Sequence, residues 1–239
     1  MPASPVTTES VSLRAADGTT MAAFVARPAS GEPGPGLLVL QEAFGVNAHI
    51  RDVAGRFAAR GYVAIAPELF HRTGPGFEGA YTDFEAIMPH MKALSEEGMR
   101  ADLAAAHAWL GADAQVTRGA TAAVGFCMGG RAAFLACATL PLSAAVSFYG
   151  GGIAPAMLGH VPSLHGPMLF FWGGLDRHID TAQRRAVVDA LTAAGHPFLN
   201  VEISDADHGF FCDARASYNP RAASLAWDLT LAFLKNHLA

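Results

Sequence analysis

One cysteine, Cys127, occupies a position where a thiol can act as a nucleophile. It follows the apolar residues 121–126, which favour a buried strand, and precedes residues 128–138, which favour a helix. Gly125 and Gly129 flank it on either side, which is the G-x-S-x-G pattern with Cys in place of Ser. Such a sharp turn leaves no room for side chains at the flanking positions, and the positive end of the helix dipole favours a thiolate. The pattern predicts a nucleophilic cysteine.

A candidate acid and a candidate base follow Cys127 along the chain. Asp176 comes soon after the strand predicted at residues 168–172, and His208 comes soon after the strand predicted at residues 198–203. A nucleophile, an acid and a base in this order are typical of α/β-hydrolases. We therefore predict a catalytic triad in which His208 takes the proton of Cys127 and Asp176 orients His208.

An oxyanion hole for this chemistry needs two N–H donors that point at the developing negative charge. The backbone N–H of Met128, the residue after the nucleophile, is the first predicted donor. The second is expected in the loop after the first parallel strand, at residues 41–45, where we predict the backbone N–H of Ala43. Both donors belong to the main chain, so side-chain substitution cannot delete them.

The remaining elements predict the fold that positions these groups. Short continuous apolar runs alternate with longer helical patterns, which indicates a mostly parallel central sheet with helices on both faces, in a single domain over residues 1–239. This is the α/β-hydrolase class of α/β fold. Strands are predicted at residues 11–13, 21–27, 36–41, 62–66, 121–126, 144–149, 168–172 and 198–203, and helices at residues 48–59, 97–110, 128–138, 181–194 and 221–237.

The irregular segment at residues 68–95 is predicted to line a pocket. It mixes Pro, Gly, aromatic residues and Met without a sustained strand or helix period, and long excursions of this kind often cover a binding site. Tyr81, Phe84 and Trp172 are candidates for its substrate-binding walls, although each aromatic ring could equally fill the core.

Composition and charge narrow the class of protein. Of 239 residues, 51% are hydrophobic and the net charge is -5 without a basic run, so the chain can bury a core and has no surface pattern for nucleic acid. Scattered histidines and three cysteines without metal-ligand spacing predict no metal. Residues 1–10 do not resemble a signal peptide, and no apolar run approaches the ~20 residues of a membrane span. We expect a cytoplasmic monomer that binds a small molecule.

Four segments together resemble the dienelactone hydrolase family, whose members are similar to carboxymethylenebutenolidase. They are residues 41–47 (QEAFGVN), 66–70 (APELF), 125–130 (GFCMGG) and 208–210 (HGF), and the resemblance extends over about residues 9–238. It implies the triad of Cys, Asp and His named above and no cofactor. It also implies that the carboxylate of Glu42, in the first of these segments, interacts with the thiol and helps to generate the thiolate when substrate binds.

The resemblance also implies arginines that hold the carboxylate of a dienelactone substrate. Arg72 is the only arginine in the irregular segment and is a candidate, with an ordinary surface charge as the alternative. The second arginine of these enzymes lies four residues after the catalytic histidine, where this chain has Cys212. Arg215, three residues further on, could substitute for it.

These observations predict a cysteine-dependent hydrolase that cleaves a carboxylic ester or lactone through a thioester acyl-enzyme. Three alternatives remain open at this point: a non-catalytic α/β-hydrolase homologue that binds a ligand, an esterase or thioesterase for an unrelated neutral substrate, and a redox-active thiol protein. The complete triad argues against the first. The absence of a resolving cysteine near Cys127 in the sequence argues against the last.

Overall fold

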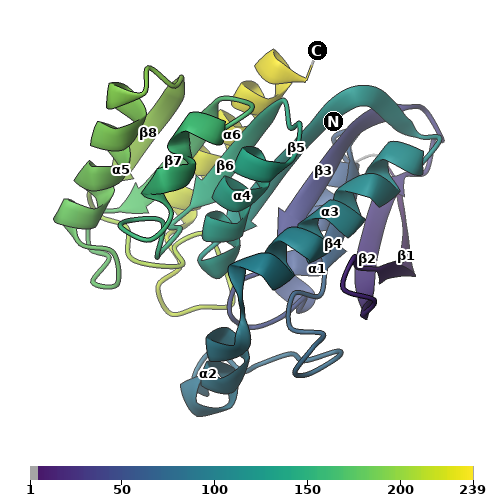
Figure 1. Ribbon diagram of the computed structural model, residues 1–239, viewed down its shortest axis with the longest axis horizontal. Coiled ribbons are helices and arrows are strands. Elements are labelled where there is room, and N and C mark those ends of the chain that lie inside the picture. Colours follow the sequence, from purple (N-terminus) through teal and green to yellow (C-terminus); the bar gives the residue numbers. More distant parts are fainter. Residues whose placement is uncertain (1–4, 239) are drawn as a thin grey trace. The chain divides into compact units, whose positions relative to one another are not determined.

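A computed structural model describes residues 5–238 (Figure 1). Residues 1–4 and 239 lie outside the described part. The ends of the predicted domain, and the first part of the segment in which we expect no signal peptide, therefore also lie outside it. The chain divides into two compact units, Met1–Ala122 and Ala123–Ala239. The single domain over residues 1–239 stays a prediction.

The first unit begins with a hairpin, β1 (Val6–Arg14) and β2 (Thr20–Pro28), whose strands are antiparallel. Both strands extend beyond the predicted ranges. Most residues of β1 are exposed, so it carries little of the apolar pattern from which strands are predicted. The turn between them contains Gly18 with φ of 85°, and Asp17 Oδ1 accepts the backbone N–H of Thr19 at 3.0 Å.

The remaining strands of the first unit continue this sheet. β4 (Val63–Pro67) pairs antiparallel with β2, and β3 (Gly34–Leu40) pairs parallel with β4, which gives the order β1-β2-β4-β3. Helices α1 (Ala48–Ala58) and α3 (Glu96–Ala112) cover opposite faces of these strands (Figure 1). Every residue of β4 is buried, which is why its sequence is a continuous apolar run.

A third helix, α2 (Phe84–Ala93), lies inside the segment that the sequence predicts to be irregular. The prediction was wrong here for a physical reason. Its apolar residues do follow helical spacing, at Phe84, Ile87, Met88 and Met91, but the helix is only ten residues long and Pro89 lies within it, which hid this pattern. Its N-terminus is capped by Asp83, whose side chain accepts the backbone N–H of Ala86 at 3.1 Å. The helix lies beyond the ends of the strands of its unit (Figure 1).

β5 (Val116–Phe126) runs from the first unit into the second. Its second half matches the predicted strand, whereas its first half is mostly exposed and carries no apolar signal. The second unit then contains α4 (Met128–Thr139), β6 (Ala144–Phe148), the short 3₁₀ helix η1 (Leu158–Ser163), β7 (Met168–Gly173), α5 (Thr181–Ala193), β8 (Phe198–Ile203) and α6 (Pro220–His237).

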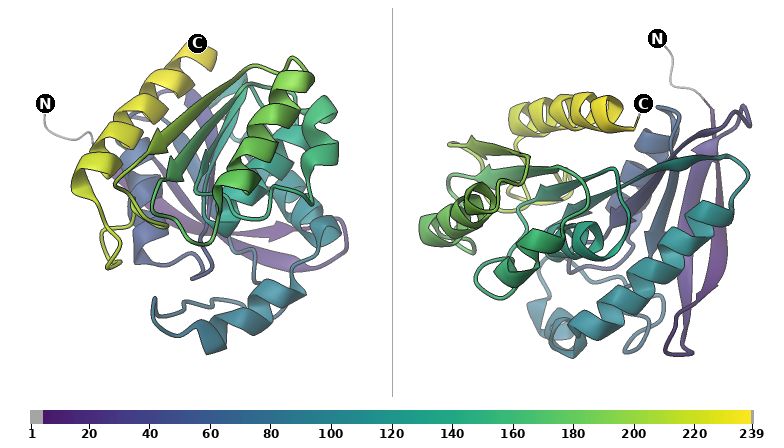
Figure 2. Two further views of the ribbon diagram at one scale, coloured as in Figure 1. Left: turned by 90° about the vertical axis from the view of Figure 1, so that its left-hand side faces the viewer. Right: turned by 45° about the horizontal axis from the view of Figure 1, so that its top comes forward.

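Within the second unit, β6, β7 and β8 are parallel neighbours. Helices α4 and α5 lie on one face of these strands and α6 lies on the other (Figure 2). Aromatic rings fill the core: Phe148 stacks on Phe126 at 4.7 Å and on Phe171 at 4.6 Å, measured between ring centroids, and all three are buried. This core fixes the strand ends from which the site residues project.

The predicted fold class, an α/β fold with mostly parallel strands and helices on both faces, is confirmed. Among the described residues, no helix is long and apolar enough to cross a membrane. A cytoplasmic location and a monomeric state stay predictions.

Candidate functional site

Cys127 occupies the sharp turn between β5 and α4. Its φ of 55° is a left-handed conformation that a residue other than glycine seldom adopts, and its backbone N–H donates to the carbonyl of Phe148 at 3.0 Å. A Cβ atom at Gly125 would overlap the carbonyl oxygen of Gly129, so the first of the two flanking glycines is required by close approach of the main chain. The turn leaves Cys127 partly exposed at the start of α4.

Loops after β7 and β8 bring an acid and a base to this cysteine. His208 Nδ1 lies 2.8 Å from Asp176 Oδ2, and the His208 side chain is also hydrogen-bonded to Cys127. The other oxygen of Asp176 accepts the backbone N–H groups of His178 at 2.7 Å and Ile179 at 3.2 Å. The carboxylate is therefore held on both oxygens, one by the main chain of its own loop and one by the imidazole.

The electrostatics of the cluster favour a charged imidazole. Burial by itself lowers the pKa of His208, but the hydrogen bonds and charges of Asp176 and Cys127 outweigh burial and raise this pKa to about 10. Burial raises the pKa of Asp176, yet its hydrogen bond with His208, the charge of His208 and the two backbone donors leave this pKa below its ordinary value. Asp176 and Cys127 thus both favour the protonated form of His208.

Two further residues of the second unit surround this cluster. Tyr149, directly after β6, has φ of 38°, and its ring centroid lies 5.0 Å from that of His208. The ring centroid of His178 lies 5.1 Å from that of His208, and the two rings meet edge to face at an interplanar angle of 71°. Tyr149 was missed by sequence reasoning, although its place at the end of a predicted buried strand is where site residues of parallel sheets gather.

Arg131, in the first turns of α4, is another residue that the sequence did not single out. Burial lowers its pKa, whereas the charge of Cys127 raises it. Its Nε has no hydrogen-bond partner among residues 5–238, and its Nη1 lies close to Gly152, where a Cβ atom would come within 3.1 Å of it. The signal that could have found it is its position four residues after Cys127, one helical turn from the nucleophile.

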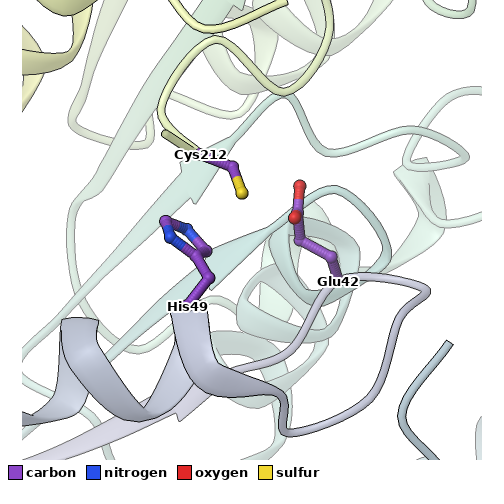
Figure 3. Close-up of side chains that lie close together, drawn as sticks. All are labelled: Glu42, His49 and Cys212. Carbon is purple, nitrogen blue, oxygen red and sulfur yellow. The ribbon is translucent and has the colours of Figure 1, made fainter. Parts of the chain in front are cut away.

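The loop after β3 carries the predicted supporting residues of the first unit. Glu42 is 1% exposed and Ala43 is 8% exposed, and Gln41 Oε1 holds the loop by accepting the backbone N–H of Leu69 at 3.0 Å. Within this unit the Glu42 carboxylate lies within 4.8 Å of a ring nitrogen of His49, which belongs to the first turn of α1 (Figure 3). Glu42 is thus a buried carboxylate beside an imidazole.

Comparison with known proteins identifies the family. The model of the dienelactone hydrolase family matches residues 21–238, nearly the whole chain. The chain belongs to the dienelactone hydrolase family. A carboxymethylenebutenolidase of Pseudomonas putida is 33% identical over 231 residues, covering 95% of this chain and 96% of that protein. A Synechocystis protein assigned as a carboxymethylenebutenolidase is 37% identical over 216 residues, covering 87% and 88% of the two chains.

A solved structure extends the similarity to three dimensions. A Klebsiella pneumoniae protein assigned to the dienelactone hydrolases aligns with a TM-score of 0.87 at 31% identity, covering 97% of this chain and 99% of that one. The predicted α/β-hydrolase fold and the predicted enzyme class, a hydrolase of carboxylic esters or lactones, are confirmed.

Arg72 differs from what the family resemblance predicts for it. Its guanidinium donates to both oxygens of Asp102, at 2.7 and 2.8 Å, and to Asp17 Oδ2 at 2.6 and 2.9 Å. Asp102 is fully buried and also contacts His71 Nε2 at 3.1 Å. Carboxylates of the chain itself already bind this guanidinium, which argues against a substrate carboxylate there, and the substrate-binding role of Arg72 stays a prediction.

We expect Arg72→Met to lower the free energy of unfolding by about 2 kcal/mol, because it leaves Asp102 buried with only His71 as a side-chain partner. Arg221→Met is the matched control, since the exposed Arg221 pairs with the exposed Asp205 and its loss should leave the free energy of unfolding nearly unchanged. Urea unfolding measures both values. Equal losses in the two variants would show that Arg72 is an ordinary surface charge.

The predicted aromatic walls divide into two kinds. Trp172 is 1% exposed, donates from Nε1 to Asn200 Oδ1 at 2.7 Å and stacks on Phe170, so it fills the core of its unit. This corrects its assignment as a pocket wall. Tyr81 accepts a hydrogen bond from Asn47 Nδ2 at 2.9 Å, and Phe84 is 52% exposed; both remain candidates for substrate contact.

The residue in place of the family's second arginine is not on the surface. Cys212, also drawn in Figure 3, is fully buried in the loop after His208, and its backbone N–H donates to the carbonyl of Gly209 at 3.0 Å. The guanidinium of Arg215 packs against Gly209, at a point where a Cβ atom on Gly209 would overlap it.

A metal site would need at least three His, Cys, Asp or Glu side chains close together. Among the described residues, neither unit by itself contains such a group. That no metal or cofactor takes part stays a prediction.

Proposed function

We propose that this member of the dienelactone hydrolase family cleaves a lactone or carboxylic ester through a thioester on Cys127. The observation that carries the proposal is the chain of contacts from Asp176 through His208 to Cys127, at a turn that holds the thiol at a helix N-terminus. Each member is positioned by main-chain contacts or by burial rather than by a flexible surface loop. A cluster of this kind suits nucleophilic catalysis.

In the proposed reaction the Cys127 sulfur attacks the acyl carbon while imidazolium His208 stands ready beside it. The C–O bond to the leaving alcohol breaks, and His208 donates its proton to the alkoxide oxygen. Neutral His208 then takes a proton from water, whose oxygen attacks the thioester; the C–S bond breaks and releases the acid and the Cys127 thiolate, with His208 again an imidazolium. Asp176 holds the imidazole in one orientation through both steps.

The negative charge on the carbonyl oxygen needs N–H donors. The helix geometry leaves the backbone N–H of Met128, at the first position of α4, without a carbonyl acceptor inside the helix, which suits it as one donor. The backbone N–H of Ala43 as the second donor and the carboxylate of Glu42 as a supporting group remain proposals from the sequence. Arg131 adds a positive charge beside Cys127, which would stabilise the thiolate by Coulomb attraction.

The proposed substrates are carboxylic esters and lactones in general, not dienelactone alone. Arg72 is held by Asp17 and Asp102, and Cys212 stands where the family resemblance predicts a carboxylate-binding arginine. These two observations favour a second candidate, an esterase or thioesterase for a neutral substrate that uses the same triad. We further propose that the enzyme acts in the cytoplasm, as a monomer, as a single domain and without a cofactor.

A substrate panel combined with mass spectrometry tests the proposal. Dienelactone, aryl esters, thioesters and larger lactones are assayed for turnover, and the enzyme is quenched during turnover and digested. We expect an added acyl mass on the peptide that contains Cys127. If turnover occurs but no quench time shows that added mass, or if another residue is acylated, the thioester mechanism is contradicted. A preference for neutral esters over dienelactone would select the second candidate.

A further inference from the structure

Arg184 is a buried arginine of α5 that the proposed mechanism does not use. It is 6% exposed, although an arginine side chain is seldom so deeply buried without a dedicated partner. The carboxylate of Glu202, which is half exposed, lies 3.4 Å from its Nη2. Burying a charged guanidinium costs desolvation free energy, and one ion pair at this distance offsets little of that cost. Arg184 must therefore be stabilised mainly by contacts other than ion pairs.

Those contacts are with the main chain of the loop that carries Asp176. Nη1 of Arg184 donates to the carbonyl of Gly173 at 3.2 Å and to the carbonyl of Ile179 at 2.9 Å. Gly173 ends β7 just before Asp176, and Ile179 comes just after it. One guanidinium nitrogen thus joins the two ends of the loop over the acid.

The same residue is itself fixed in place. Its Nη2 donates to Thr181 Oγ1 at 3.0 Å, in the first turn of α5. That helix begins with a capping box, in which Asp180 Oδ1 accepts the backbone N–H of Gln183 at 2.8 Å and Gln183 Oε1 accepts the backbone N–H of Asp180 at 3.0 Å. The helix end, the arginine and the loop therefore form one rigid piece.

The loop closed by Arg184 also determines how the carboxylate is oriented. Ile179, whose carbonyl Arg184 binds, donates its own N–H to Asp176 Oδ1 at 3.2 Å, while Oδ2 of the same carboxylate faces His208 at 2.8 Å. A shift of the Ile179 peptide would move the support of one oxygen and so rotate the other away from the imidazole. Small displacements of this kind are costly in catalysis, because the hydrogen bond depends on both distance and angle.

We infer that Arg184 is a positioning residue, which acts on the reaction by holding the two ends of the Asp176 loop. It touches neither substrate nor the reacting atoms. This role rests on the proposed function of the triad, because it matters only if Asp176 orients a working His208. A methionine of similar length would fill the same space but would leave the carbonyls of Gly173 and Ile179 without their donor.

A double-mutant cycle between Arg184 and Asp176 tests the inference. We expect Arg184→Met to lower kcat by about 10- to 100-fold, with KM changed less than about threefold, as is typical when a group that orients a reacting residue is lost. In the Asp176→Asn background the same substitution should have almost no further effect, because the group on which it acts has gone. If the two losses multiply, Arg184 does not act through Asp176 and the inference is overturned.

Two additional variants keep the test decisive. Arg185→Met, at the exposed neighbouring position of the same helix, is the matched control and should leave kcat unchanged. If Arg184→Met does not fold, Arg184→Lys is used instead. Lysine retains the charge but has one terminal nitrogen, so it cannot bind the two carbonyls and Thr181 Oγ1 in the fixed geometry of the guanidinium, and its kcat should also fall. Full activity of a folded Arg184→Lys or Arg184→Met enzyme would contradict the inference.

A readout that needs no substrate separates this inference from the proposed function. The Nδ1 proton of His208, in its hydrogen bond to Asp176, should give a low-field proton NMR signal that Arg184→Met shifts or broadens and Arg185→Met leaves in place. An unchanged signal in Arg184→Met overturns the inference even if turnover is never found. A changed signal in a protein that hydrolyses no ester would instead reject the proposed function and leave the positioning role intact.

Discussion

Cys127→Ala should lower the rate of ester or lactone hydrolysis by at least about 10⁴-fold, because the proposed reaction has no covalent route without the sulfur. The Cys127 side chain is partly exposed, so we expect the alanine variant to fold. Residual turnover would come from backbone donors and substrate binding alone. The measurement is kcat/KM on the best substrate of the panel, together with a thermal unfolding curve.

Cys127→Ser separates the thiol from its geometry. Serine should fit the same turn, but a hydroxyl gives up its proton far less readily than a thiol, and the proposed reaction depends on a sulfur nucleophile beside His208. We therefore expect a loss close to that of Cys127→Ala. Cys137→Ala is the matched control: Cys137 is fully buried in α4 and its Sγ donates to the carbonyl of Gly166 at 3.2 Å, so activity should be retained. Unchanged turnover in Cys127→Ala would contradict the mechanism.

The chemistry of the second unit was accessible from the sequence because its signals are local. Cys127 is identified by the glycines on either side of it, of which Gly125 is required by close approach of the main chain, and Asp176 and His208 each follow a predicted strand. The strands that were predicted too short, such as β1, are those whose residues face solvent on most positions. Exposed strands lack the pattern on which prediction depends.

The remaining features depend on contacts between distant residues, which no local pattern encodes. Arg72 has the sequence context of a candidate ligand-binding arginine, yet Asp102, 30 positions away, occupies it. Arg184 looks like an ordinary charge in an amphipathic helix until its contacts with Gly173 and Ile179 are seen. Trp172 ends a predicted strand at the site edge, but its ring turns into the core. Only the packed structure decides between these roles.

Asp176→Asn should lower the rate of acylation by about 10³- to 10⁴-fold while leaving substrate binding nearly intact. The amide still fits the loop, because its oxygen can accept the backbone N–H groups of His178 and Ile179. It cannot supply the negative charge that stabilises imidazolium His208. Burial, which lowers the pKa of His208, is then opposed by Cys127 alone. Stopped-flow acylation by an activated ester measures the effect, with Asp189→Asn, at an exposed position of α5, as the control.

The pH dependence gives the same substitution a second, independent signature. The pKa of His208 is raised from 6.5 to about 10, so its stabilising contribution is complete below 6.5 and is lost as pH rises through about 10. The pKa of Asp176 is lowered from 3.8, so its contribution is present above 3.8 and is lost as pH falls through the folded value. Wild type should therefore exceed Asp176→Asn in thermal stability most clearly near about pH 5 to 6, and the difference should shrink as pH rises above 6.5 and be nearly lost by about pH 10. The acylation rate should fall at high pH when His208 loses its proton, and this fall should occur at lower pH in Asp176→Asn. If it occurs at the same pH in both proteins, Asp176 does not raise the pKa of His208.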